Sequence, residues 1–238
     1  RLPSCLIMSC SVELLCVGNE LLIGRTVNTN ATWLASRITS LGGFVSRVTT
    51  VGDDVKEIQE VVRGILVRKP EFLITSGGLG PTFDDLTLKG VAKGTNRPLR
   101  VNREALEQIR EHYRRIFSAR CLVLTKPRLK MAMLPTGAKP LPNPVGTAPG
   151  MMLQVRGTTL ISLPGVPKEL RAIFSEHVDP LVRLRAGTSG YLLRSIRVSG
   201  ILESDLAPLV SRVMKRHGMV YIKSHPQGGE GLSLIHIS

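Results

Sequence analysis

The feature that most constrains this 238-residue chain is a regular alternation of short apolar runs with amphipathic segments. Apolar, β-rich runs at 12–17, 44–51 and 72–76 predict strands. Between them, apolar residues recur three or four positions apart at 31–41 and 55–66, which predicts helices. The connections are too short for anything but crossovers, so the pattern predicts a parallel sheet with helices on both faces. Ligands of such sheets gather beyond the carboxyl ends of the strands.

Further elements follow from the same reasoning along the rest of the chain. They are helices at 84–95, 102–118, 168–176 and 204–216, and strands at 150–155, 159–163, 192–198 and 220–223. The segment 127–149 contains six prolines and is therefore expected to be largely extended. A linker near 185–190 separates a main domain at 12–183 from a small α+β module at 190–238, which we expect to be incomplete.

Composition excludes several classes of protein. Hydrophobic residues make up 42% and charged residues 21%, which excludes wholesale disorder. The four cysteines show no CxxC spacing, so we expect reduced thiols and a cytoplasmic protein. The apolar stretch 6–17 is interrupted by polar residues and is too short for a membrane span, so no membrane partner is expected. The net charge of +14 suits phosphorylated ligands, although ordinary basic surfaces also carry such an excess.

A glycine-rich loop at 77–86, GGLGPTFDDL, follows the strand predicted at 72–76. Its glycines let the backbone approach a ligand, and the helix after it adds a positive end, so the loop is typical of a phosphate cradle. Asp84 and Asp85 lie at the start of that helix. One of them could serve as an N-cap, but two successive carboxylates beside an anion site indicate a bridging cation.

A second carboxylate pair, Asp53 and Asp54, lies at the end of the strand at 44–51. Capping of the next helix accounts for one of them. The two pairs together predict a divalent ion, Mg²⁺ above all, held partly by the protein and partly by substrate phosphate. Glu20 could join this metal shell. Asn28 and Asn30 could bind a ribose or a heterocycle, although the favoured role of Asn30 is as a helix N-cap.

Five ordered blocks then carry a resemblance to a known family. They are GNELLIGRTVNTN at 18–30, VGDD at 51–54, TSGGLGPTFDDLT at 75–87, NPVGTAPGM at 143–151 and LPGVPKE at 163–169. In these blocks the chain resembles the MoaB/Mog family, and more closely its CinA amino-terminal branch. The resemblance implies a three-layer α/β sandwich with a mostly parallel sheet that binds a pterin or a nucleotide diphosphate. The segment after 190 is similar to the start of a KH-like module.

The resemblance also implies an activity. Two aspartates that are essential in the molybdopterin adenylyltransferase branch match Asp53 and Asp85. In the CinA branch the site is associated with metal-dependent hydrolysis of the pyrophosphate in ADP-ribose-like dinucleotides. Leu79 stands where adenylyltransferases have threonine, which favours the hydrolase. The deamidase activity of a separate CinA carboxyl-terminal domain is not expected, because no residues here correspond to that domain.

The expected contacts follow from this assignment. The residues expected to hold the diphosphate are Gly77, Gly78, Gly80 and Thr82, and those expected to close the far wall are Gly146, Thr147, Gly165 and Lys168. Asp53 and Asp85 must then lie around one cavity. Dimers and trimers both occur among the relatives, so a homo-oligomer is expected.

Three other functions stay open at this point. Pterin adenylyl transfer and non-catalytic binding of a pterin or nucleotide fit the same residues. RNA binding is least favoured, because it depends on the net charge and on a loose similarity of 228–231 to a GXXG loop.

Overall fold

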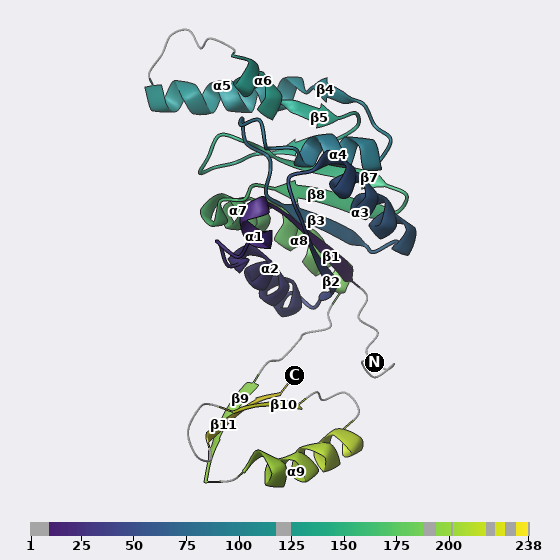
Figure 1. Ribbon diagram of the computed structural model, residues 1–238, viewed down its shortest axis with the longest axis vertical. Helices are drawn as coiled ribbons and strands as arrows, with labels where there is room; N and C mark the ends of the chain where they lie inside the picture. The colour runs from purple at the N-terminus through teal and green to yellow at the C-terminus, as the bar shows by residue number, and fades with distance from the viewer. Residues whose placement is uncertain are drawn as a thin grey trace. The chain divides into compact units, whose positions relative to one another are not determined.

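The structure is a computed structural model that describes residues 10–117, 125–187, 194–200, 202–217, 222–226 and 232–237. It divides into two compact units, of which the larger spans Cys10–Gly187 (Figure 1). The described elements of the smaller unit lie between residues 194 and 237.

A six-stranded sheet with the order β2-β1-β3-β8-β7-β6 forms the centre of the larger unit. In that order the strands are β2 (Phe44–Val51), β1 (Ser11–Val17), β3 (Phe72–Ser76), β8 (Thr158–Leu163), β7 (Gly150–Val155) and β6 (Lys139–Leu141). The first four are parallel to one another, whereas β7 runs antiparallel to both β8 and β6. The two central strands β3 and β8 are buried throughout, so their apolar residues supply both faces of the sheet.

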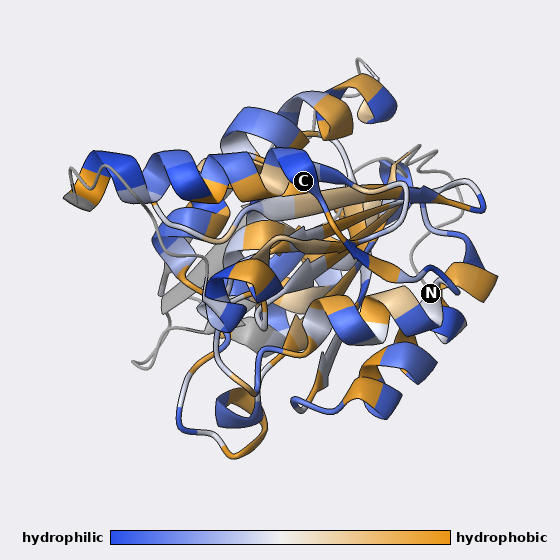
Figure 2. Ribbon diagram, turned by 90° about the horizontal axis from the view of Figure 1, so that it is seen from above, coloured by the Kyte–Doolittle hydropathy of each residue, from blue (hydrophilic) through white to orange (hydrophobic). Residues whose placement is uncertain are grey.

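Helices cover both faces of this sheet, and each face has its own hydrophobic core. One core includes residues of α3 (Val55–Arg68), α4 (Thr87–Gly94), α5 (Arg103–Phe117) and α6 (Lys126–Met131). The other includes residues of α2 (Thr29–Ser40), α7 (Pro167–Ile173), the π-helical turn η1 (Phe174–Val178) and α8 (Asp179–Ala186). In Figure 2 the central strands are largely hydrophobic, while the surrounding helices also carry hydrophilic residues. The predicted α/β fold with a mostly parallel sheet is confirmed.

Three local predictions were wrong. The segment 127–149 is not extended at its start, because α6 includes Pro127 in its first turn, where proline costs no hydrogen bond. After α6, β5 (Met133–Pro135) pairs antiparallel with β4 (Leu99–Val101). The helix expected from residue 84 begins only at Thr87, and a single helical turn, α1 (Asn19–Leu22), lies between the predicted strand at 12–17 and the predicted helix at 31–41, where no element was predicted.

The smaller unit contains β9 (Arg194–Ser199), α9 (Glu203–Arg216), β10 (Ile222–Pro226) and β11 (Leu232–Ile237). Strand β11 lies between β10 and β9 and is antiparallel to both. The sequence predicted a β-α-β piece, and β11 was not predicted, although its short apolar run follows a glycine-rich segment. Its KH-like character stays a prediction, and the GXXG-like residues 228–231 lie outside the described residues.

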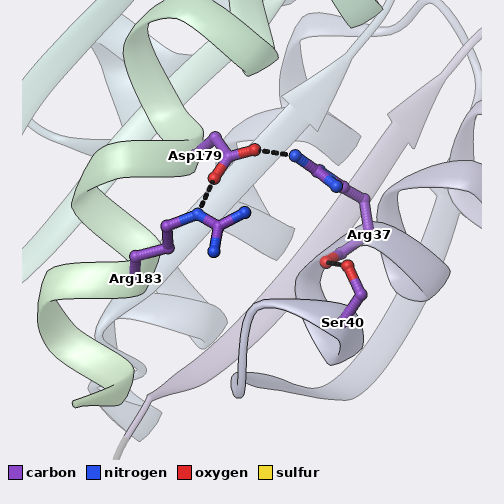
Figure 3. A network of polar contacts seen from close by, with 4 residues as sticks. All are labelled: Arg37, Ser40, Asp179 and Arg183. Atoms are coloured by element: carbon purple, nitrogen blue, oxygen red, sulfur yellow. Dashed lines mark hydrogen bonds and ion pairs between the residues drawn. The ribbon is translucent and has the colours of Figure 1, made fainter. Parts of the chain in front are cut away.

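A network of three charged side chains ties the second helix to the end of the larger unit (Figure 3). The buried carboxylate of Asp179 accepts hydrogen bonds from Arg37 of α2 and, at 2.7 Å, from Arg183 of α8. Burial opposes ionisation of Asp179, but the two arginines outweigh it and hold the pKa of this carboxyl below its ordinary value. The ionised form therefore stabilises the fold.

This network predicts a stability difference that depends on pH. Replacement Asp179→Asn should lower the free energy of unfolding by about 1–3 kcal/mol at pH 7, because both arginines lose their anionic partner. A carboxyl whose pKa is lower in the folded than in the unfolded state stabilises the folded protein at pH values above the unfolded-state pKa, about 3.9. This contribution is lost as the pH falls through the folded-state pKa. Urea unfolding from pH 7 to pH 3 should therefore show the gap between wild type and variant closing in acid. A gap that stays constant would contradict the ion-pair explanation.

Candidate active site

The loops after four parallel strands meet at the carboxyl edge of the sheet. The Gly18 amide, after β1, donates to the Val51 carbonyl of β2 at 3.1 Å. The Gly77 amide, after β3, donates to the Leu163 carbonyl of β8 at 3.0 Å. The loops at 18–28, 52–54, 77–86 and 164–166 are thereby brought to one place, as expected for ligand sites of open α/β sheets.

Gly77 lies at a crowded point of this edge. Its φ of +102° is a conformation that favours glycine, and a Cβ there would lie 2.2 Å from the Val17 carbonyl oxygen. Its own carbonyl accepts a hydrogen bond from Thr87 Oγ1 at 2.7 Å. Gly77 thus contacts β1, β8 and α4, so a side chain at this position would force the loops apart.

A cavity of about 250 Å³ opens between these loops. Ten residues proposed from sequence line it, namely Glu20, Asn28, Asn30, Asp53, Gly77, Gly78, Thr82, Asp84, Asp85 and Gly165. Asp53 and Asp85, which are 32 positions apart in the chain, therefore face one cavity. None of the described residues that line it is basic, whereas four are acidic.

Asp53 is held by a neighbour that sequence reasoning missed. The Asn19 amide donates to Asp53 Oδ2 at 2.9 Å, and the Asp53 amide donates to Asn19 Oδ1 at 3.2 Å. This reciprocal pair fixes the loop after β2 against the start of α1. The only sequence signal was the position of Asn19 between Gly18 and Glu20 in a block already considered functional.

Asp85 does not cap a helix, contrary to the alternative considered for the Asp84–Asp85 pair. Its Oδ2 accepts hydrogen bonds from the Thr82 amide at 2.8 Å and from Thr82 Oγ1 at 2.6 Å. The Thr82 hydroxyl also contacts Asp84 Oδ1, and the N-cap of α4 is Leu86, which has no side-chain cap bond. Gly80 lets the carboxylate come close, because a Cβ there would lie 2.6 Å from Asp85 Oδ2.

Lys130 of α6 supplies a positive charge beside the acidic loop. Its Nζ donates to the Thr82 carbonyl, 48 positions away in the chain. The pKa of Asp84 is lowered, first by the hydrogen bond from Thr82, with a smaller contribution from the charge of Lys130. Nothing in the sequence indicated this lysine, because its segment was expected to be extended.

The helix cap expected at Asn30 is provided by Asn28 instead. Asn28, not Asn30, is the N-cap of α2, since its Oδ1 accepts from the Ala31 amide at 3.0 Å. Asn30 lies within the first turn and donates through Nδ2 to Ser76 Oγ at 3.1 Å and to the Gly165 carbonyl at 2.8 Å. The prediction of Asn30 as a cap was wrong, and its side chain instead ties α2 to the ends of β3 and β8.

Several predicted site residues lie elsewhere. Asp54 does not line the cavity, because it is the N-cap of α3 and its Oδ1 accepts from the Lys56 and Glu57 amides. These hydrogen bonds hold the pKa of Asp54 below its ordinary value. Lys168 is exposed and also lies outside the cavity lining.

Three further residues that were predicted to bind the ligand, Gly80, Gly146 and Thr147, do not line the acidic cavity. Gly80 and Thr147 line a neighbouring cavity, which Gly165 also borders. Gly146 packs against the carboxyl group of Glu169.

The acidic cavity does not form a metal cage by itself. Within the described part of the chain, no group of three or more His, Cys, Asp or Glu side chains is arranged to hold a metal ion. Mg²⁺ is commonly held by one or two carboxylates together with substrate phosphates and water. Asp53 and Asp85 fit that shared arrangement, whereas they do not fit a permanently bound structural metal.

The close approach at Gly77 predicts a large loss of stability on substitution. Replacement Gly77→Ala should lower the free energy of unfolding by about 2–4 kcal/mol, through backbone strain and the clash with Val17. Gly157→Ala is a matched control, because Gly157 also has a positive φ but its added Cβ would meet nothing within 4 Å. It should cost only about 1 kcal/mol in the same urea unfolding experiment. Equal losses would show that crowding at Gly77 is unimportant.

Comparisons with known proteins agree with this fold. The family described as "Probable molybdopterin binding domain" matches residues 13–184. A protein of Aeropyrum pernix is 50% identical over 214 residues, covering 90% of this chain and 78% of its own length. A protein of Metallosphaera sedula is 46% identical over 220 residues, covering 92% of this chain and 81% of its own.

Solved structures give the same result. The crystal structure of CinA from Thermoplasma acidophilum, a protein of unknown function, is 42% identical with a TM-score of 0.65, and the match covers 72% of this chain and 98% of CinA. A molybdopterin biosynthesis protein from Mycobacterium abscessus, at 16% identity and a TM-score of 0.51, covers 75% of this chain and 94% of its own and shares the fold. No helix in the described ranges is long and apolar enough to cross a membrane. With a family match at 13–184 that covers nearly all of the sheet and the acidic cavity, the chain belongs to the MoaB/Mog family of molybdopterin-binding domains.

Proposed function

We propose that this chain is a Mg²⁺-dependent nucleotide pyrophosphatase of the CinA type that hydrolyses ADP-ribose or a similar dinucleotide. The observation that carries the proposal is that Asp53 and Asp85 line one cavity together with the glycine loop. A site with four carboxylates and no basic lining residue repels a diphosphate unless a cation lies between them. The proposal accounts for both the glycine loop and the carboxylates.

The diphosphate is proposed to lie against Gly77, Gly78 and Thr82. Glycines at the first two positions let backbone groups approach phosphate oxygens closely. The helix α4 begins directly after the loop without a side-chain cap, and the amide of its first residue, Thr87, donates to the Gly78 carbonyl at 3.2 Å. The positive end of the helix then favours an anion at this position.

Water is proposed to attack one phosphorus atom of the pyrophosphate. The amide and the hydroxyl of Thr82 both donate to Oδ2 of Asp85. We therefore assign to Oδ1 the role of orienting the water and accepting its proton. Asp53, held by Asn19, supports the opposite wall. A divalent ion in this site would neutralise phosphate charge and favour ionisation of the water. Cleavage of the P–O bond then yields two phosphomonoesters, AMP and ribose 5-phosphate in the case of ADP-ribose.

A second candidate is pterin adenylyl transfer, which the family match favours. One residue disfavours adenylyl transfer: Leu79 is buried in the core, and it stands where adenylyltransferases have a threonine with its hydroxyl. This function predicts release of pyrophosphate from ATP only when molybdopterin is present, and no AMP from ADP-ribose alone. A homo-oligomer and a cytoplasmic location remain parts of the proposal.

The catalytic carboxylates are tested by conservative replacement. With ADP-ribose and Mg²⁺, Asp85→Asn and Asp53→Asn should each lower kcat/KM for AMP formation by at least about 100-fold, since loss of a general base or ligand typically costs 10²–10⁴-fold. Asp54→Asn should retain activity within about threefold, because asparagine also caps helices well. Wild type that forms no AMP, or an Asp85→Asn variant with full activity, would overturn the proposal.

Lys130 provides a separate test of the loop geometry. Replacement Lys130→Met should lower kcat/KM by about tenfold, because Thr82 loses a hydrogen bond and the carboxylates lose a neighbouring cation. Lys126→Met, at the exposed start of the same helix, is the matched control and should change kcat/KM by less than about twofold. Indistinguishable kinetics for the two variants would exclude a positioning role for Lys130.

A further inference from the structure

A second cavity, of about 420 Å³, borders the same glycine loop. It shares Gly78, Asp85 and Gly165 with the acidic cavity, so one ligand can extend from one cavity to the other along the loop. Its walls are mostly apolar or aromatic and are formed by Leu79, Pro81, Tyr113, Met131, Ala148, Pro164 and Val166. Such walls fit a flat ring better than a sugar or a phosphate.

Among the described residues that line this second cavity, the charged side chains are Asp85 and Glu169 of α7. Glu169 is half-buried, and its Oε2 accepts a hydrogen bond from Asn143 Nδ2 at 2.7 Å. Asn143 is itself held by its own loop, because its Oδ1 accepts from the Gly146 amide at 2.8 Å and its Nδ2 also donates to the Ala148 carbonyl at 2.9 Å. The carboxylate is therefore fixed by a side chain that has no freedom to turn away.

Gly146 brings the backbone of that loop directly against the carboxylate. A Cβ at this position would lie 2.2 Å from Glu169 Cδ and within 2.5 Å of both carboxylate oxygens. Any larger residue would displace Glu169. Glu169 is thus a preorganised hydrogen-bond acceptor. Its Oε2 accepts from Asn143, which leaves Oε1 to accept from a ligand.

We propose that Glu169 determines specificity by accepting a hydrogen bond from the exocyclic amino group of a heterocycle bound in this second cavity. The inference rests on the proposed function, because it takes the diphosphate linked to that heterocycle to lie on the glycine loop. An ionised carboxylate only accepts hydrogen bonds. Inside apolar walls it favours a ring that offers an N–H donor and rejects one that offers a carbonyl oxygen, because the two acceptors would then face each other unpaired.

Adenine and pterin both carry such an amino group. Comparing each ring with an analogue that lacks the amino group shows which of the two is recognised. Hypoxanthine and lumazine have a carbonyl oxygen where adenine and pterin, respectively, have the amino group. Calorimetric titration with AMP, IMP, pterin and lumazine measures binding without turnover. Wild type should bind AMP at least about tenfold more tightly than IMP, or pterin at least about tenfold more tightly than lumazine, as one charged hydrogen bond provides. The pair that is discriminated identifies the ring.

Glu169→Gln is the decisive variant. Its amide can accept from an amino group or donate to a carbonyl, so the preference should shrink to about twofold or less. Glu60→Gln, on the exposed face of α3, is the matched control and should retain the wild-type ratio. Circular dichroism establishes that both variants are folded. Should Glu169→Gln fail to fold, Asn143→Asp replaces it: with its Nδ2 donor lost, this variant should also reduce the wild-type ratio.

The outcomes separate this inference from the proposed function. Equal affinities within both pairs, no binding of AMP or pterin at millimolar concentration, or a preference that survives Glu169→Gln would overturn the role of Glu169. Loss of ring discrimination in a protein that still hydrolyses ADP-ribose would leave the pyrophosphatase proposal intact. If the protein discriminates between the rings but forms no AMP, Glu169 remains a specificity residue and the proposal of a pyrophosphatase is contradicted.

Discussion

The arrangement at the carboxyl edge of the sheet depends on the close packing of backbone around Gly77. Its amide joins the end of β3 to the end of β8, its carbonyl accepts from Thr87 at the start of α4, and its Cα leaves no room for a side chain beside Val17. Only a residue without Cβ allows three chain segments to meet there. Because this contact holds the glycine loop at 77–86 against the ends of β1 and β8, it positions a loop that lines both cavities.

The second constraint on the site is electrostatic. Four acidic residues line a cavity beside a glycine loop suited to anions, and the described lining contains no basic residue. Asn19, Thr82 and Lys130 hold two of the acidic loops by hydrogen bonds, so the carboxylates stay together in spite of their repulsion. A preorganised anionic site of this kind favours a ligand that brings a divalent ion with its phosphates. The apolar second cavity then offers room for the ring at the end of such a ligand.

Much of the fold was predictable because the signals are local. Runs such as 72–76 are apolar without interruption, and the spacing at 55–66 fits one helix face, so strand and helix could be assigned without tertiary information. Predictions failed where one residue type has two uses. Asparagine both caps helices and bonds to distant backbone: Asn28 proved to be the cap, whereas Asn30, which was expected to be the cap, donates to the Gly165 carbonyl. Proline both breaks and begins helices, and α6 was missed for that reason.

The sequence by itself indicated the alternating strands and helices at 12–76, the edge of the sheet at which a ligand site is expected, and the two loops that carry Asp53 and Asp85. Periodicity and the rule that parallel strands end on one side are sufficient for the elements and the edge, whereas a catalytic role of the two aspartates is implied only by the family resemblance. Only the tertiary structure decided which carboxylates face the cavity: Asp53 does, whereas the adjacent Asp54 caps α3. It also decided that Lys130 and Glu169 lie beside the glycine loop. The reason is physical, since side-chain direction and contacts across many residues depend on packing between helices and sheet, which no local pattern records.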